Sequence, residues 1–272
     1  MTLPVHLYQI AYSDDSAAAI EPGYAMLDNR SNPRPDWYEY WPIRQFLLNA
    51  TLDEAGFYGF FSPKFGSKTG LSHAQVVEFV QMNAATSDVC LFSPQPDMAA
   101  FFWNVFEQGE TFDVGFIDAF HAFLTAVGRP ADLRTMVMDS RQIVFSNYFV
   151  ARLAFWREWL KLTEPMFAIC EGPATPLREQ LTCATSYGPN APRKVFMLER
   201  LASFLLTTQP QWRTRAANTF NFAWSASRLS TQPIEAFISD ALKIAMREQG
   251  YPQYQLAFNE VRKRFIGSKV GT

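Results

Sequence analysis

The chain has 272 residues, of which 48% are apolar and 18% are charged, and its formal net charge is -2. This composition excludes a disordered protein, because the chain can bury a large core, and it gives no basic footprint of the kind that binds nucleic acid. Aromatic residues make up 15%, which suits a dense core or a cleft that stacks sugars or bases.

The cysteines and the apolar runs bear on the compartment. Cys90, Cys170 and Cys183 are widely spaced and fit neither a metal site nor a disulfide framework, as expected in a reducing cytosol. The first residues lack the layout of a signal peptide, and no apolar run approaches the length that spans a membrane. We expect a cytoplasmic protein without a transmembrane segment. The basic run 262–264, with Lys269, suggests at most a weak contact with a membrane surface.

The first strand is predicted over 3–11, and turn residues follow it. In an open α/β sheet, groups just past the carboxyl end of the first strand commonly face the ligand. Asp14 and Asp15 are therefore candidates for contacts with a ribose, a base or a metal ion, and an Asx-type turn or a helix cap is the alternative for each. Asp28, which follows a short second strand over 24–27, is a third candidate.

A capping-box pattern, Asp36 followed by Glu39, predicts a helix from there to about Asn49. The stretch 57–62 then reads as a fully buried strand, aromatic on both faces and stopped by Pro63. A loop with two lysines and two glycines follows, and a second capping box, Ser72 with Gln75, opens the next helix.

The order strand, Gly/Lys loop, helix N-terminus is one that α/β proteins use to hold an anion. The Walker motif requires a Gly, four residues and then Gly-Lys-Ser/Thr, and the spacing around Gly66 and Lys68 excludes it. A looser phosphate or sugar-phosphate site at Ser62, Lys64 and Lys68 remains open, and the alternative is two solvated loop lysines.

The remaining elements follow in alternation. The pattern predicts strands over 88–92 and 143–150, with Ser146 and Asn147 placing polar groups inside the second of these. The predicted helices cover 72–81, 97–107, 112–127, 153–162, 175–184, 193–207 and 234–249.

Strands alternating with helices up to residue 150 predict the α/β class, with a three-layer, mostly parallel sheet. Residues 151–272 read as a helical C-terminal half that packs over one edge of it. Because this half has no evident sheet of its own, we expect a single domain over 1–272. It would consist of an α/β half, 1–150, and a mainly helical half, 151–272.

The predicted helix 193–207 is apolar nearly all round, which indicates burial. Glu199, Arg200 and Ser203 form its polar strip. Burying a charge is costly unless it is paired, so this strip predicts either a structural ion pair or the lining of a functional cleft.

Several short motifs, taken in order, resemble a known family. Glu39-Tyr40-Trp41 precedes the Tyr58-Gly59-Phe60 strand, Ser146-Asn147-Tyr148-Phe149-Val150 leads into Phe155-Trp156, and Phe196-Met197-Leu198-Glu199-Arg200-Leu201 follows. This order resembles the GT-A-like, Rossmann-related glycosyltransferases of bacterial capsule and O-antigen gene clusters, over roughly residues 5–206.

The resemblance implies transfer of a sugar from a nucleotide-diphosphate donor to a glycan or lipid-linked glycan acceptor. It also implies that the half 1–150 binds the nucleotide sugar and that 151–272 forms the acceptor side. It places Asp14 and Asp15 near the nucleotide, Lys64 and Lys68 near phosphate or acceptor, and Asn147 at the cleft. The neighbouring Tyr148 belongs to the same motif and is counted with the substrate-binding residues. Glu199 becomes the candidate general base, and Arg200 would hold that carboxylate or neutralise the leaving diphosphate.

One departure concerns the cofactor. Metal-dependent members of that superfamily carry Asp-x-Asp at a strand end, where it holds Mn²⁺ or Mg²⁺, and this chain has no Asp-x-Asp. Metal use and activity itself therefore stay open. The main alternative is a non-catalytic nucleotide- or glycan-binding or scaffold protein on the same fold. A hydrolase is weakly indicated, because no Gly-x-Ser-x-Gly elbow is present.

Overall fold

The computed structural model describes residues 3–266, and residues 188–190 are described in their backbone only. Its centre is a mixed six-stranded sheet in the order β2-β1-β3-β5-β4-β8. The strands are β1 (Val5–Ala11), β2 (Ala25–Asp28), β3 (Phe57–Phe61), β4 (Val89–Leu91), β5 (Phe149–Arg152) and β8 (Thr214–Ala216). β5 runs antiparallel to both of its neighbours, and the other pairs are parallel. The predicted α/β class is confirmed, with one reversed strand inside the sheet.

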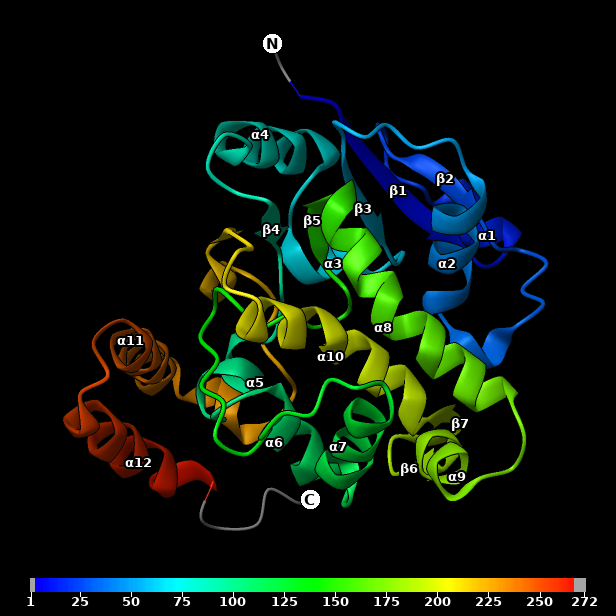
Figure 1. Ribbon diagram of the computed structural model, residues 1–272. Helices are drawn as coiled ribbons and strands as arrows, with labels where there is room; N and C mark the ends of the chain where they lie inside the picture. Colours follow the sequence, from blue (N-terminus) through cyan, green and yellow to red (C-terminus); the bar gives the residue numbers. More distant parts are fainter. Residues whose placement is uncertain (1–2, 267–272) are drawn as a thin grey trace.

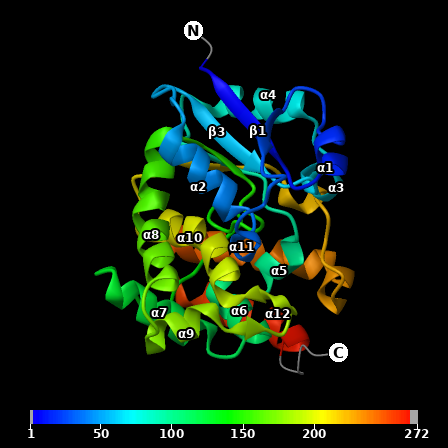
Figure 2. The ribbon, with the colours of Figure 1, turned by 90° about the vertical axis from the view of Figure 1, so that its right-hand side faces the viewer.

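Helices cover both faces of this sheet. The α-helices are α1 (Asp14–Ala18), α2 (Tyr40–Asn49), α3 (Phe65–Thr69), α4 (His73–Asn83), α5 (Pro96–Ala100), α6 (Val105–Phe112), α7 (Phe116–Ala126), α8 (Leu153–Glu171), α9 (Pro176–Thr182), α10 (Arg193–Thr208), α11 (Pro233–Gln249) and α12 (Pro252–Ile266). Figure 2 shows α2 and α8 on one side of β1 and β3 and α3 on the other.

β3 shows why the sheet needs helices on both faces. Its five residues are all buried, and successive side chains of a strand point to opposite faces. Tyr58 and Phe60 belong to the larger core with α2, α8 and α10. Phe57 and Phe61 belong to a smaller core with α3 and α4.

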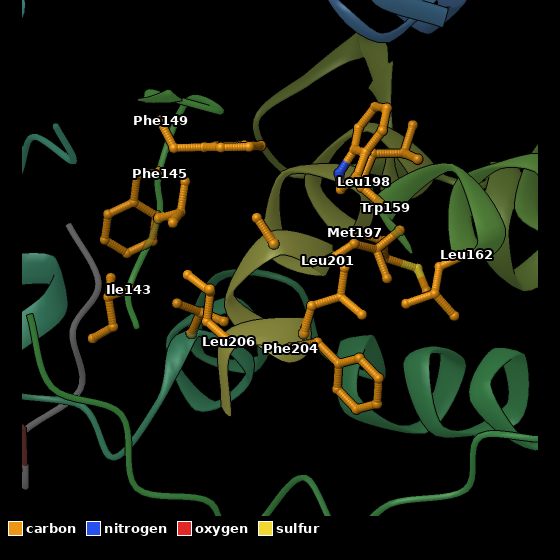
Figure 3. Close-up of a cluster of buried hydrophobic side chains, with 14 of the residues drawn as sticks. Ile143, Phe145, Phe149, Trp159, Leu162, Met197, Leu198, Leu201, Phe204 and Leu206 are labelled. Atoms are coloured by element: carbon orange, nitrogen blue, oxygen red, sulfur yellow. The ribbon is translucent and has the colours of Figure 1, made fainter. Parts of the chain in front are cut away.

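The larger core forms around α10. Its apolar side chains Met197, Leu198, Leu201 and Phe204 lie among residues of α8 and of the segment before β5 (Figure 3). Near this cluster, the Trp156 ring stacks on Phe149 with 4.4 Å between centroids. α10 is therefore buried on most sides, as its sequence predicts, and it fixes the position of any polar group that it carries.

The strand predicted over 143–150 is wrong over its first six residues. Residues 143–148 lie outside any strand, and β5 begins at Phe149. Buried backbone N–H groups there bond to side chains: Val144 N donates to Ser203 Oγ at 2.9 Å, and Phe145 N donates to Ser93 Oγ at 2.9 Å. These bonds satisfy groups that a strand ladder would otherwise pair.

Two predicted helix starts also differ. Pro35–Trp37 forms a 3-10 turn, and α2 begins at Tyr40 with Glu39 as an N-cap whose side chain makes no capping hydrogen bond. The helix predicted over 97–107 is divided, because the Asn104 side chain accepts from Phe106 N and Glu107 N and starts α6 there. By contrast, the capping box of Ser72 and Gln75 is confirmed.

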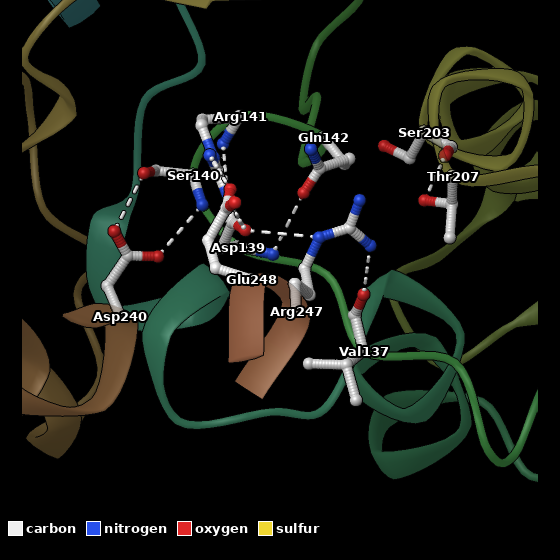
Figure 4. Close-up of polar contacts among 10 residues, drawn as sticks. All are labelled: Val137, Asp139, Ser140, Arg141, Gln142, Ser203, Thr207, Asp240, Arg247 and Glu248. Atoms are coloured by element: carbon white, nitrogen blue, oxygen red, sulfur yellow. Dashed lines mark hydrogen bonds and ion pairs between the residues drawn. The ribbon is translucent and has the colours of Figure 1, made fainter. Parts of the chain in front are cut away.

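The second half of the chain is joined to the first by strand and side-chain contacts. β8 completes the sheet beside β4, and a short hairpin, β6 (Ala184–Thr185) with β7 (Gly188–Pro192), precedes α10. α11 and α12 pack side by side at the end of the molecule away from β2 (Figure 1). Figure 4 shows the polar contacts that attach α11 to the segment 137–142. The predicted division at residue 150 stays a prediction, and Lys269 lies outside the described residues.

Candidate functional site

The site lies at the edge of the sheet where β1 and β3 end. The chain passes from β1 to β2 on one side and then crosses to β3 on the other, which makes a topological switch point, the usual ligand position in open α/β sheets. Because β5 is antiparallel, its first residue lies at this same edge. Tyr12 follows β1, Ser62 follows β3 and Tyr148 precedes β5. The hydroxyl groups of Ser62 and Tyr148 are hydrogen-bonded at 2.6 Å.

A lysine from α3 reaches the same place. The predicted Gly/Lys loop is largely this short helix, which ends at Gly70 in the left-handed conformation with φ of 70°. Lys68 Nζ donates to Ser146 Oγ at 3.0 Å and lies 5.5 Å from the centroid of the Tyr148 ring. Burial lowers the pKa of Lys68, and the carboxylates of Glu199 and Glu39 oppose that shift. Lys68 is therefore a partly buried cation next to two acidic groups.

The backbone before β5 is strained at the site. Ser146 and Asn147 have φ of 59° and 54°, a region that non-glycine residues rarely adopt. Such strain clusters at ligand sites, where the surrounding structure fixes it. This conformation lets the Ser146 N–H donate to the Glu199 carboxylate. The Asn147 side chain is buried, and no described residue bonds to its Oδ1.

Glu199 is the acidic group that α10 brings to the site. Its side chain is half-buried, and its neighbours on both sides of the chain, Leu198 and Arg200, are buried. Burial raises the pKa of the Glu199 carboxyl to about 7. The Arg200 guanidinium lowers it, the nearby Glu39 carboxylate raises it further, and Lys68 lowers it. A carboxyl in this condition exchanges a proton near neutral pH.

Glu39 is the second acidic group. Burial raises the pKa of its carboxyl, against its own backbone N–H and the cations of Lys68 and Lys64. It lines a cleft of about 830 Å³. The residues lining this cleft are Tyr12, Asn32, Pro35, Asp36, Tyr38, Glu39, Thr182, Ala184 and Pro192. We call this the Glu39 cleft. The Glu39 carboxylate lies close enough to raise the pKa of the Glu199 carboxyl, as like charges do.

Tyr12 adds an unpaired hydroxyl to the Glu39 cleft. No described residue bonds to its OH, although that atom is buried from water. Burial, together with the nearby Glu39, raises the pKa of the phenol, so it stays protonated. A buried hydroxyl without a partner carries a desolvation cost that a ligand group can relieve.

The structure does not bring the other predicted residues into this cluster. The Arg200 guanidinium donates to the carbonyls of Val105 and Phe196 and to the Gln108 side chain, so it points into the protein. Arg30 bonds to both Asp14 and Asp28 on the surface.

Two more predicted residues, Asp15 and Lys64, lie on the surface. Asp15 is exposed in α1. Lys64 is also exposed, and it interacts with the site through the charge of Glu39. A substrate role for any of these residues outside the cluster stays a prediction.

Sequence reasoning missed Glu39, Tyr12 and the lysine contact of Ser146 as parts of one site. Glu39 stood out in the sequence, but it was assigned to a capping box with Asp36. In the structure a 3-10 turn precedes it, and its side chain makes no capping hydrogen bond. In the sequence, Tyr12 was assigned to the turn that follows the first strand. Its position directly after β1 was the signal that could have identified it.

Within residues 3–266, no group of three or more His, Cys, Asp or Glu side chains that could hold a metal ion is found. At the candidate site there are two such side chains, Glu39 and Glu199, and a lysine interacts with both. In the same part of the chain, no helix combines the length and the apolar character needed to cross a membrane.

Comparison with known proteins yields one distant likeness. No protein-family model and no curated protein matches this chain. The chain is similar to the apo structure of WbbM, a bifunctional glycosyltransferase, with a TM-score of 0.42 and 15% sequence identity. The similar region covers 79% of this chain and 44% of the WbbM chain, so this chain spans less than half of that protein. The chemistry of the site therefore has to be argued from its own residues.

Proposed function

We propose that the protein is a glycosyltransferase that moves a sugar from a nucleotide-diphosphate donor to a hydroxyl of a glycan acceptor. The observation that carries the proposal is the pair Glu39 and Glu199 beside Lys68, at the switch point of an α/β sheet. An acid pair accepts protons and hydroxyl hydrogen bonds, and a cation beside it neutralises phosphate charge. The order of short motifs along the chain supports the same class.

In this proposal Glu199 is the general base. The acceptor hydroxyl attacks the anomeric carbon, the bond from that carbon to the diphosphate oxygen breaks, and the hydroxyl proton passes to the Glu199 carboxylate. A base is most effective when its pKa lies near the working pH, and the pKa of Glu199 is about 7. The Ser146 N–H fixes the orientation of the carboxylate.

Lys68, with Lys64, supplies the positive charge that the leaving nucleoside diphosphate needs. Because Lys68 is partly buried, its charge acts in a medium where electrostatic attraction is stronger than in water. Tyr12 and Asn147 supply the hydrogen-bonding atoms without protein partners, one hydroxyl and one carbonyl oxygen, which a polyhydroxylated ligand can pair. The proposal assigns no step to Mn²⁺ or Mg²⁺.

The test measures donor binding and transfer separately. A panel of nucleotide-diphosphate sugars is screened by thermal shift with magnesium or manganese and again with EDTA, and transfer is then assayed with the donor that stabilises the protein. Glu199→Gln should lower kcat by about 10²- to 10⁴-fold, the usual range for general acid–base catalysis, with donor affinity unchanged. Lys68→Ala should weaken donor binding both with the metal ions and with EDTA.

Two surface variants serve as matched controls. Glu78→Gln changes an exposed acid on α4, and Lys161→Ala changes an exposed cation on α8. Both should leave binding and transfer unchanged. If no nucleotide diphosphate stabilises the protein, the enzyme proposal fails. If donors bind but Glu199→Gln transfers as fast as the wild type, Glu199 is not the base.

The second candidate is a nucleotide- or glycan-binding protein that does not catalyse transfer. The unpaired Tyr12 hydroxyl and the Glu39 cleft serve binding equally well. Ligand binding without transfer to any acceptor in the panel would favour this candidate.

A further inference from the structure

A second surface cleft, of about 420 Å³, lies between α2 and the end of β2. One wall consists of Trp41, Pro42, Gln45, Phe46, Asn49 and Ala50 of α2 and its C-cap. The opposite wall is formed by Leu27 and Asp28 of β2 and by Asn29, Ser31 and Pro33 of the following loop. We call this the Trp41 cleft. None of the residues proposed for the transfer reaction lines it.

The α2 wall combines an indole with two amides. Trp41, Gln45 and Asn49 are four residues apart, so they form one stripe along the helix. Asn49 Nδ2 donates to Gln45 Oε1 at 3.2 Å, which orients both amides toward one another. Among the described residues, none accepts a hydrogen bond from Trp41 Nε1, whereas Trp37 Nε1 donates to Glu171. The stripe offers an apolar ring and several polar atoms to a ligand.

The indole of Trp41 is held in place from within the protein. The guanidinium carbons of Arg34 and Arg44 lie 5.6 and 5.9 Å from its ring centroid. Each of these arginines is fixed by α8: Arg34 by Glu171 at 2.5 Å and Arg44 by Glu164 at 2.6 Å. A preorganised ring costs little conformational entropy on binding.

Charge selects the class of ligand. None of the residues that line the Trp41 cleft is Lys or Arg. The Asp28 carboxylate is paired with Arg30 at 2.8 Å, so the lining carries no unpaired charge. A neutral ligand fits this lining better than a phosphate-bearing ligand such as a nucleotide. A sugar ring has an apolar face that packs on an indole and hydroxyl groups that bond to amides, carboxylates and a serine hydroxyl.

The loop after β2 separates this cleft from the Glu39 cleft. Ser31 and Pro33 line the Trp41 cleft, and Asn32 between them lines the Glu39 cleft. Asn32 adopts φ of 36°, and its Oδ1 accepts from Asn29 Nδ2 at 3.3 Å. Alternate residues of one short loop thus border both clefts, which makes the two clefts neighbours on the surface.

We propose that the Trp41 cleft is a glycan-binding subsite, in which a sugar unit of an oligosaccharide packs on Trp41 and bonds to Gln45 and Asn49. That this oligosaccharide is the acceptor of the transfer reaction rests on the proposed function. The binding itself does not.

The test uses an array of defined bacterial oligosaccharides of one to six sugar units, probed with the intact protein. Wild type should bind a set of glycans of two or more units, and Trp41→Ala should weaken them about tenfold, the size expected for one aromatic contact. Gln45→Ala, which leaves the Trp41 packing in place, should weaken the same glycans. Leu48→Ala, on an exposed part of α2 outside the cleft, is the control and should bind as the wild type does.

Binding of no glycan, or equal binding by wild type, Trp41→Ala and Gln45→Ala, would overturn the subsite. Failure of the proposed function gives a different pattern. In that case nucleotide sugars give no thermal shift, while the array still shows glycans that depend on Trp41. Glu199→Gln should keep the array pattern in either case, because Glu199 does not line the Trp41 cleft.

Discussion

At the scale of single residues, the candidate site is locally unfavourable, and its cost in folding free energy has to be offset by the rest of the fold. Two carboxyl groups, those of Glu39 and Glu199, interact with one another, and burial opposes the charge of both. Ser146 and Asn147 add backbone strain at the same place. Natural proteins break local rules of this kind mainly at functional sites. The cost should be measurable as a dependence of stability on pH.

Glu199→Gln should stabilise the protein at pH 8 and leave it unchanged at pH 4.5. The folded pKa of Glu199, about 7, lies above its ordinary value of 4.5, so between these values the folded protein holds a proton that the unfolded chain releases. Stability therefore falls as pH rises from 4.5 to 7, and Gln removes this penalty. The gain expected at pH 8 is about 1–3 kcal/mol, measured by denaturant unfolding across this range. The surface variant Glu78→Gln should show no such window, and a loss of stability at every pH would show that Glu199 is a structural ion-pair partner.

The residues of the site were predictable to unequal degrees. Glu199 and Asn147 could be identified because polar groups within buried patterns require partners. Ser62 and Lys68 were identified from the loop that follows the strand 57–62, and Tyr148 from its place in the motif that resembles a known family. These predictions give the residues and place them next to strands or on α10. Glu39 was not predicted as a site residue, because it follows Tyr38, whose φ of 48° no local sequence pattern indicates. In the sequence, Arg200 belongs to the same polar strip as Glu199, so both were expected at the site. The sequence could not show that the Arg200 guanidinium points into the protein, because two of its three acceptors lie on the distant helix α6.

At the scale of elements, the sequence predicts best where local patterns agree with burial. β3 and α4 were identified from an aromatic run and a capping box, and both are present. The strand predicted at 143–150 was wrong over its first six residues. The backbone N–H groups of Val144 and Phe145 donate to the hydroxyl groups of Ser203 and Ser93, which lie far away in the sequence, and these bonds replace a ladder there. β8 was missed because three residues at the edge of a sheet carry too little periodicity to be recognised.

The glycine inside β3 is required by the packing between β3 and β5. Gly59 pairs with Val150, and a Cβ built on Gly59 would lie 2.8 Å from Val150 Cγ2 and 3.0 Å from Leu7 Cδ2. Gly59→Ala should therefore destabilise the protein by about 1–3 kcal/mol, the usual cost of overpacking, measured by urea unfolding. Adding Val150→Ala should relieve the clash. The double variant should therefore lose less stability than the sum of the losses in the two single variants. Full stability of Gly59→Ala would show that β5 lies further from β3 than described.

At the scale of the whole molecule, the two halves of the chain share one sheet and one core. β8 lies beside β4, and α10 packs into the larger core with residues from both halves. Helix α11 is attached at a distance from the sheet by polar contacts with the segment 137–142 (Figure 4), and α12 packs against α11. Among these contacts, Ser140 N and Oγ donate to Asp240 at 2.8 and 2.7 Å. The cooperativity of unfolding should depend on whether these contacts couple the α11–α12 pair to the rest.

Asp139 is the residue at which this coupling can be tested. Its side chain is fully buried and forms ion pairs with Arg141 at 2.9 Å and with Arg247 of α11 at 3.2 Å. Arg141 also pairs with Glu248, so removing Asp139 leaves the Arg247 guanidinium without its ion-pair partner. Asp139→Ala should therefore cost about 3–5 kcal/mol. We expect wild type and variant each to unfold in one calorimetric transition, because loss of α11 would expose the large core. Asp118→Ala breaks an exposed pair with Arg134 and should cost at most about 1 kcal/mol. Two transitions in the variant, with early proteolysis confined to α11 and α12, would instead show that these helices unfold as a separate unit.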